Sequence, residues 1–302
     1  MTNIAIIAHN VSTPLYKHRS KEFSERIYFM AKRFNEIHII SREGNINNKD
    51  KISIKDELAS NLIVHKVSND FIFSNLDILR VVRSIKADVM FADGIDDGAN
   101  SLLCKNRCKI PLITFIQGYE ADLKAIAVKQ KFRIKPTPGL LSNVFALHDS
   151  IVLRASDKIL CVSPGLVSYA RSLIPRKDWD KIKFIPHSLQ YVRHISGKAI
   201  AWANDFIGSL KIGNDQKFLL LMTVGTGPLK GTDIALKSYK YISKRNPNAV
   251  MIVVGKTIDS RYINMARELG FKNNVLFLQN LPRDYVLALL SHSSIFLCPS
   301  FS

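Results

Sequence analysis

One glycine-containing turn combines residue types that bind phosphate groups. Residues 219–239 read LLLMTVGTGPLKGTDIALKSY: an apolar strand, a turn with two glycines, and a helix with Thr232 as its expected N-cap. Glycines let the backbone approach a ligand, and the N–H groups and dipole of a helix N-terminus attract anions. Lys230 lies just before the helix, where its ammonium group would meet a diphosphate. The predicted phosphate-binding residues are Gly225, Thr226, Gly227, Lys230, Gly231 and Thr232.

This turn departs from two stricter phosphate-binding patterns. The order Lys230-Gly231-Thr232 is not the Gly-Lys-Thr order of a P-loop. A dinucleotide fingerprint needs a third glycine where Lys230 stands, which disfavours a dehydrogenase. The alternative interpretation is a tight strand–helix connection with a surface lysine.

The following segment, residues 250–300, continues the alternation of strands and helices. One strand ends at Val254-Gly255, another gives way to a turn near Leu281, and a final strand ends at Pro299-Ser300. Together with Lys230-Gly231, this order resembles the nucleotide-binding half of glycosyltransferase family 4 (glycosyl transferases group 1). The resemblance implies the GT-B fold, an α/β architecture of two Rossmann-like domains. It adds Gly255, Lys256, Leu281 and Ser300 to the expected donor-binding residues.

The N-terminal half is similar to the acceptor half of that family. The matching segments are ADVMFADG (87–94), PLITFIQGYEADL (111–123), ASDKILCVSPGL (155–166) and KIKFIPHSLQ (181–190). The resemblance implies acceptor binding at Gly118, Tyr119, Glu120 and His187. His9 joins them because it ends the first strand, where open α/β sheets bind ligands.

The resemblance implies transfer of a sugar from a nucleotide-sugar donor to a glycan or lipid-linked acceptor. Enzymes of this kind retain the anomeric configuration and work without a bound metal. The resemblance implies no cofactor, because the nucleotide sugar is itself a substrate. Cationic side chains and a helix N-terminus stabilise the leaving diphosphate. Gln117 and Lys230 are the expected catalytic residues, and biosynthesis of a cell-envelope polysaccharide is the expected setting.

Three departures keep an inactive sugar-nucleotide binder, or a truncated gene product, as the alternative. Thr226 stands where the family has an arginine, so one charge-assisted bond to the diphosphate is lost. Gln117 replaces a histidine, and an amide cannot exchange a proton near neutral pH. The paired glutamates that grip the donor sugar would follow Ser302 and are absent from this sequence.

The pattern of apolar runs predicts where the two domains lie. Runs such as Ile4–Ala8 and Val250–Val254 are apolar throughout, as in parallel sheets covered on both faces. The alternation lapses after residue 190 and restarts at Phe218. We therefore expect an acceptor-side domain over 1–195, a connection over 196–216, and a nucleotide-sugar-binding domain over 217–302 that is incomplete.

The composition of the chain limits the classes of molecule that it is expected to bind. The net charge of +18 predicts an anionic partner, but no nucleic-acid module is recognisable. The basic stretch 123–139 contains no acidic residue and would suit either an anionic membrane surface or a solvated loop. No basic leader precedes the first apolar run, so we expect a cytoplasmic enzyme, with peripheral attachment to the inner face of the membrane as an open alternative.

The four cysteines should be reduced and two of them buried; Cys161 and Cys298 lie in apolar, strand-like runs.

Overall fold

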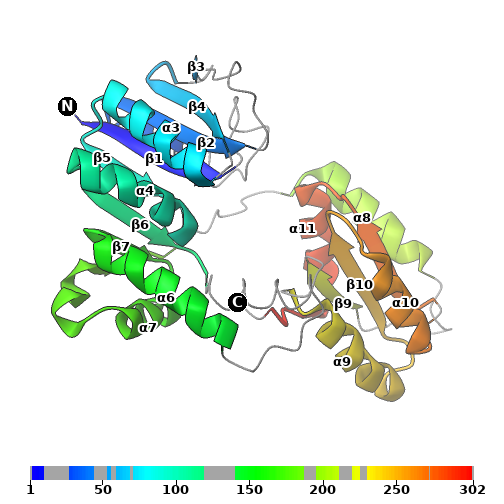
Figure 1. Cartoon of the computed structure of the whole chain (residues 1–302). Coiled ribbons are helices and arrows are strands. Elements are labelled where there is room, and N and C mark those ends of the chain that lie inside the picture. The colour runs from blue at the N-terminus through cyan, green and yellow to red at the C-terminus, as the bar shows by residue number, and fades with distance from the viewer. Residues whose placement is uncertain are drawn as a thin grey trace. The chain divides into compact units, whose positions relative to one another are not determined.

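A computed structural model shows two compact units, Met1–Gln190 and Tyr191–Ser302 (Figure 1). The structure describes residues 2–9, 27–43, 53–55, 59–68, 71–118, 140–186, 195–210, 220–224, 230–271 and 273–300.

The first unit is built on an eight-stranded sheet. Its strands are β1 (Asn3–His9), β2 (Glu36–Glu43), β3 (Ser53–Lys55), β4 (Leu62–Ser68), β5 (Val89–Ala92), β6 (Leu112–Ile116), β7 (Lys158–Cys161) and β8 (Ile182–Phe184). The order is β3-β4-β2-β1-β5-β6-β7-β8, and every pair is parallel except β3 with β4. The chain therefore reverses its direction of travel across the sheet between β1 and β5.

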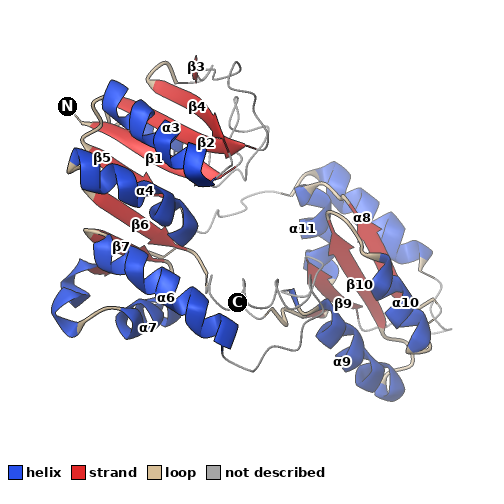
Figure 2. Ribbon diagram, viewed as in Figure 1, coloured by secondary structure: helices blue, strands red, loops and turns tan. Residues whose placement is uncertain are grey.

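Helices pack against this sheet (Figure 2). They include α3 (Phe71–Ser84), α4 (Ile95–Cys108), α6 (Leu140–Ala155) and α7 (Pro164–Leu173), and a 3-10 helix, η1, spans Arg176–Lys181. Alternate residues of β1 enter different cores: Ile4 and Ile6 pack with Ile27, whereas Ala5 and Ile7 pack with Ile78 of α3. A strand buried on both faces must be apolar at every position, as the sequence indicated.

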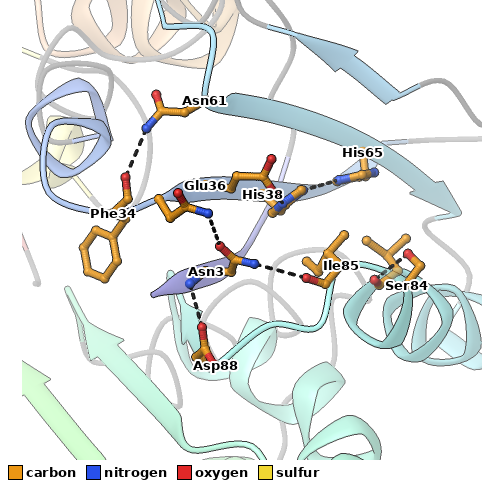
Figure 3. A network of polar contacts seen from close by, with 11 residues as sticks. Asn3, Phe34, Glu36, His38, Asn61, His65, Ser84, Ile85 and Asp88 are labelled. Atoms are coloured by element: carbon orange, nitrogen blue, oxygen red, sulfur yellow. Dashed lines mark hydrogen bonds and ion pairs between the residues drawn. The ribbon is translucent and has the colours of Figure 1, made fainter. Parts of the chain in front are cut away.

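A polar network lies at the amino end of this sheet (Figure 3). The backbone N–H of Asn3 donates to Asp88 Oδ2 at 2.7 Å, and Asn35 Nδ2 donates to Asn3 Oδ1 at 3.1 Å. On β2 and β4, His38 Nδ1 lies 2.9 Å from His65 Nε2, and His38 Nε2 lies 3.1 Å from Glu36 Oε2. The contacts of Asn3 join β1 to the turns before β2 and β5. They stabilise the edge opposite the carboxyl ends of the strands.

The second unit has a four-stranded parallel sheet. Its strands are β9 (Leu220–Val224), β10 (Val250–Gly255), β11 (Val275–Gln279) and β12 (Ile295–Phe296), in the order β11-β10-β9-β12. Its helices are α8 (Gly197–Ser209), α9 (Thr232–Arg245), α10 (Ser260–Glu268) and α11 (Arg283–His292). One core contains Leu236 and Tyr239 of α9, and the other contains Ala199 of α8 and Ala288 of α11. Both units are therefore Rossmann-like, as the sequence predicted.

Helix α8 lies within the stretch 196–216 that the sequence assigns to a connection. Ala199 and Ala203 are fully buried against Val250 and Ile252 of β10. Trp202 stacks on Phe206 with ring centroids 5.3 Å apart. This helix is thus part of the core of the second unit, which begins at Tyr191.

The cysteines differ in part from expectation. All four are free thiols, and the two buried ones are Cys104 and Cys161. Cys298 is exposed and lies beyond β12, which ends at Phe296 and is itself exposed at Ile295 and Phe296. The prediction of a strand reaching Cys298 was therefore wrong at its carboxyl end.

Among the described helices, none combines the length and apolar character needed to cross a bilayer.

Candidate functional site

The carboxyl ends of the second unit's strands gather most of the predicted donor residues. From β9 the chain runs outward to β10 and β11, and it then crosses back to place β12 on the other side of β9. In open α/β sheets, ligands bind outside the carboxyl ends of the strands at such a reversal. The reversal between β9 and β12 is therefore the candidate donor site.

The start of α9 and the turn after β12 touch at this reversal. Gly231 has a φ of 65°, in the left-handed region that favours glycine. A Cβ placed on Gly231 would lie 2.1 Å from the carbonyl oxygen of Pro299. This contact brings Lys230, Gly231 and Thr232 beside Pro299 and Ser300, which lie far away along the chain.

One detail of the helix start differs from the prediction. The N-cap is Gly231, and Thr232 is the first residue of α9. The left-handed backbone of Gly231 makes the turn, so Thr232 enters the helix and its side chain is completely buried. Gly231 is buried as well, so the exposed residue beside this turn is Lys230.

The remaining donor residues lie on the neighbouring strands. Gly255 is the buried last residue of β10, and the exposed Lys256 follows it. The N–H of Asn280 donates to the carbonyl of Gly255 at 2.8 Å, which holds the half-buried Leu281 near the end of β10. Gly225, Thr226 and Gly227 lie outside the described residues.

The first unit carries a separate polar cluster at the carboxyl edge of its own sheet. His9 ends β1, and Gln117 and Gly118 follow β6. Gln117 Nε2 donates to Asp93 Oδ1 at 2.8 Å, and the Asp93 N–H donates to the carbonyl of Ile7 at 3.0 Å. Asp93 follows β5, next to the reversal between β1 and β5. Tyr119, Glu120 and His187 lie outside the described residues.

Sequence reasoning missed Asp93. The residue stands in the polar-Gly turn of ADVMFADG, but nothing in that segment indicates its hydrogen bond to Gln117. Within the described residues, no three His, Cys, Asp or Glu side chains gather as a metal-binding group.

The family of the second unit can be read from its sequence. Residues 207–302 match the family model described as Glycosyl transferases group 1. The second unit is therefore similar to glycosyl transferases group 1 over most of its length. The match includes the turn at Lys230-Gly231, the end of β10 and the Pro299-Ser300 turn.

Solved glycosyltransferase structures share the fold of the whole chain. Anabaena Alr3699/HepE in complex with UDP-glucose superposes with a TM-score of 0.67 at 12% identity, covering 100% of this chain and 75% of that chain. Sucrose-phosphate synthase from Thermosynechococcus elongatus gives 0.68 at 11% identity, with 100% and 76% coverage. WaaG, a glycosyltransferase involved in lipopolysaccharide biosynthesis, gives 0.60 at 16% identity, with 99% and 75% coverage. No curated protein sequence matches the chain. The fold is thus GT-B, with two Rossmann-like units, as predicted.

Proposed function

We propose that the protein transfers a sugar from a nucleotide-sugar donor to a glycan or lipid-linked acceptor. The observation that carries this proposal is the contact of Gly231 with Pro299 at the strand reversal of the unit that is similar to glycosyl transferases group 1. The HepE structure holds UDP-glucose, which supports a nucleotide-sugar donor.

The donor diphosphate would be held at the N-terminus of α9. The N–H groups of the first turn and the helix dipole favour a negative charge there. The exposed Lys230 would add a point charge, although an ammonium group lacks the bidentate fork of the missing arginine. Stabilising the leaving diphosphate in this way requires no metal ion, and we propose a retaining reaction without one.

The acceptor would bind at the carboxyl edge of the first unit. The Gln117 amide, fixed by Asp93, would bind a sugar hydroxyl without exchanging a proton. Gly118 would let a ligand approach the backbone, and His9 ends β1, which lies next to β5 in the sheet. Tyr119, Glu120 and His187 are further candidates from the sequence alone.

We also propose peripheral attachment to an anionic membrane at its cytoplasmic face. The support is the net charge of +18 and the basic segment 123–139, which lies outside the described residues. A membrane surface would bring a lipid-linked acceptor, such as a cell-envelope polysaccharide precursor, to the enzyme.

Substituting Lys230 with alanine tests the donor site. We expect Lys230→Ala to weaken binding of the preferred nucleotide sugar about tenfold, the loss typical of one hydrogen bond to a charged group. The measurement is calorimetric titration with UDP-, GDP- and ADP-sugars, followed by assay of nucleotide release. Lys240→Ala, an exposed lysine further along α9, is the matched control and should bind like the unaltered protein.

Two outcomes would change this interpretation. Equal affinity in Lys230→Ala and Lys240→Ala would remove the donor site from the start of α9. Binding of a nucleotide sugar without any nucleotide release, with glycan and lipid acceptors supplied, would favour the inactive binder instead. The replacements Thr226 and Gln117 are the features that favour this second function.

A further inference from the structure

A row of polar side chains joins three helices of the first unit. On α6, His148 Nδ1 lies 3.0 Å from Asp149 Oδ1. The Tyr169 hydroxyl of α7 donates to Asp149 Oδ2 at 2.7 Å. On the other side of the ring, His148 Nε2 lies 3.9 Å from Asp96 Oδ1 of α4.

The centre of this row is completely buried and its outer end is open. The Asp149 side chain has 0% exposure, whereas those of His148 and Asp96 are 37% and 53% exposed. A buried carboxylate is costly unless hydrogen bonds satisfy it, and the Tyr169 hydroxyl and the His148 ring both do so. Because a carboxylate only accepts, the proton of a neutral His148 ring lies on Nδ1. Its Nε2 is then the acceptor that faces Asp96 Oδ1.

The open end of the row lies near the carboxyl edge of the sheet. Asp96 is the second residue of α4, which begins directly after β5 and the Asp93–Gln117 pair. Helix α6 packs closely on α4: a Cβ on Gly98 would lie 2.6 Å from Val152 Cγ1. The His148 ring is therefore held over the first turn of α4, where Asp96 follows Asp93 by three positions.

We propose that Asp96 and His148 form a hydroxyl-binding pair for the acceptor sugar, with Asp149 and Tyr169 as positioning residues. This inference rests on the proposed glycosyltransferase function and extends its acceptor site. The pair presents two acceptor atoms, Asp96 Oδ1 and His148 Nε2, side by side at 3.9 Å. Two acceptors at this spacing suit the two donor protons of neighbouring hydroxyl groups on a sugar ring. The acceptor moiety is thus a sugar with an adjacent pair of free hydroxyls.

The test uses simple glycosides as probes of this pair in the full chain. The methyl glycosides of glucose, mannose, galactose and N-acetylglucosamine are titrated to about 50 mM, far enough to detect weak monosaccharide binding. The readout is the NMR signal of the His148 ring, assigned by its loss in His148→Gln. We expect at least one glycoside to shift this signal in a saturable way. Absence of a shift with all four glycosides would overturn the proposal.

Three variants separate a ligand role from a structural one. His148→Gln changes a partly exposed side chain and should weaken glycoside binding about tenfold, as for one lost hydrogen bond. Tyr169→Phe removes the hydroxyl but keeps the ring packing, and should weaken binding less while altering the His148 signal of the free protein. His292→Gln in the second unit, whose Nε2 contacts Asn204, is the matched control.

A parallel titration with UDP-glucose keeps the two proposals distinguishable. His148→Gln should bind UDP-glucose like the unaltered protein, because the donor residues lie in the other unit. If glycosides bind equally well to His148→Gln and to the control, the hydroxyl-binding pair is refuted whatever the donor result. Failure of every nucleotide sugar to bind would count against the proposed function and leave the glycoside result standing.

Discussion

At position 231 the backbone has a left-handed conformation and lies against the carbonyl group of Pro299. Its φ of 65° is costly for residues with a side chain, and the Pro299 carbonyl occupies the space where a Cβ would project. Glycine is therefore needed at position 231 for two reasons: the positive φ, and the close approach of Pro299 in the turn after β12.

Replacing Gly231 tests that contact. We expect Gly231→Ala to lower the free energy of unfolding of the second unit by roughly 2–4 kcal/mol, combining backbone strain with a steric clash. Urea unfolding measures this loss. Gly270→Ala is the matched control, since Gly270 also has a positive φ of 89° but nothing lies within 4 Å of an added Cβ. The control should lose only about 1 kcal/mol; equal losses would show that the Pro299 contact contributes nothing.

The histidine pair on β2 and β4 makes the first unit sensitive to acid. Burial, with a smaller contribution from His38, lowers the pKa of His65 from 6.5 to about 4. The unfolded chain therefore takes up a proton near pH 6.5 that the folded chain rejects until about pH 4. This contribution to stability is complete above pH 6.5 and is lost as the pH falls towards 4.

Unfolding at two pH values checks this effect. We expect the free energy of unfolding to fall by roughly 1–2 kcal/mol more between about pH 7 and pH 4.5 in the unaltered protein than in His65→Gln. The expected change is smaller than the full pKa shift would give, because the His65 ring is partly exposed and solvent screens its charge. An identical pH dependence in both proteins would contradict the assignment.

At the scale of elements, close packing of α4 depends on a glycine. Gly98 faces Val152 of α6 and Thr114 of β6, and a Cβ there would lie 3.2 Å from Thr114 Oγ1. The same packing places Asp96 beside His148. The spacing of α4 from α6 and β6 therefore decides the geometry of the proposed hydroxyl-binding pair.

A larger residue at position 98 should separate these elements. We expect Gly98→Val to lower the free energy of unfolding of the first unit by roughly 1–3 kcal/mol, because overpacking outweighs the gain in helix propensity over glycine. Gly208→Ala in α8 is the contrasting variant, because nothing lies within 4 Å of an added Cβ there. It should be neutral or stabilising by up to about 1 kcal/mol. Chemical denaturation of both variants measures the difference, and tolerance of valine at position 98 would contradict this packing.

At the scale of the whole molecule, the charge of +18 predicts a salt-dependent attraction to anionic surfaces. We expect binding to phosphatidylglycerol vesicles to fall at least about tenfold between low and physiological salt, and binding to phosphatidylcholine vesicles to be weak throughout. Co-sedimentation with vesicles measures both.

Two sets of neutralising substitutions locate this attraction. Replacing the basic residues of 123–139 with glutamine should weaken vesicle binding more than replacing five exposed basic residues of the second unit. The first set is Lys124, Lys129, Lys131, Arg133 and Lys135, and the second is Lys237, Lys240, Lys244, Arg245 and Lys256. Equal effects would indicate a diffuse electrostatic attraction without a membrane-binding segment.

Local patterns were sufficient for much of the fold. Apolar runs predicted β1 and β10, and the glycine turn with its expected N-cap predicted α9, since each signal is contained in a few consecutive residues. Helix α4 was not predicted, because its buried face includes Asp97, Asn100 and Ser101 in place of an apolar stripe. A buried polar face is recognisable only when its hydrogen-bond partners are known.

Patterns of consecutive residues were enough to predict the alternating architecture, the family resemblance and the position of Lys230-Gly231 before a helix. Tertiary structure decided which residues meet: Gly231 with Pro299, Gln117 with Asp93, and His148 with Asp96. Each of these contacts joins residues on different elements, and their spacing depends on strand order and helix packing. Short-range patterns carry no information about such distances. Of the candidate donor site, the sequence could therefore predict the turn that leads into α9, but not its contact with Pro299.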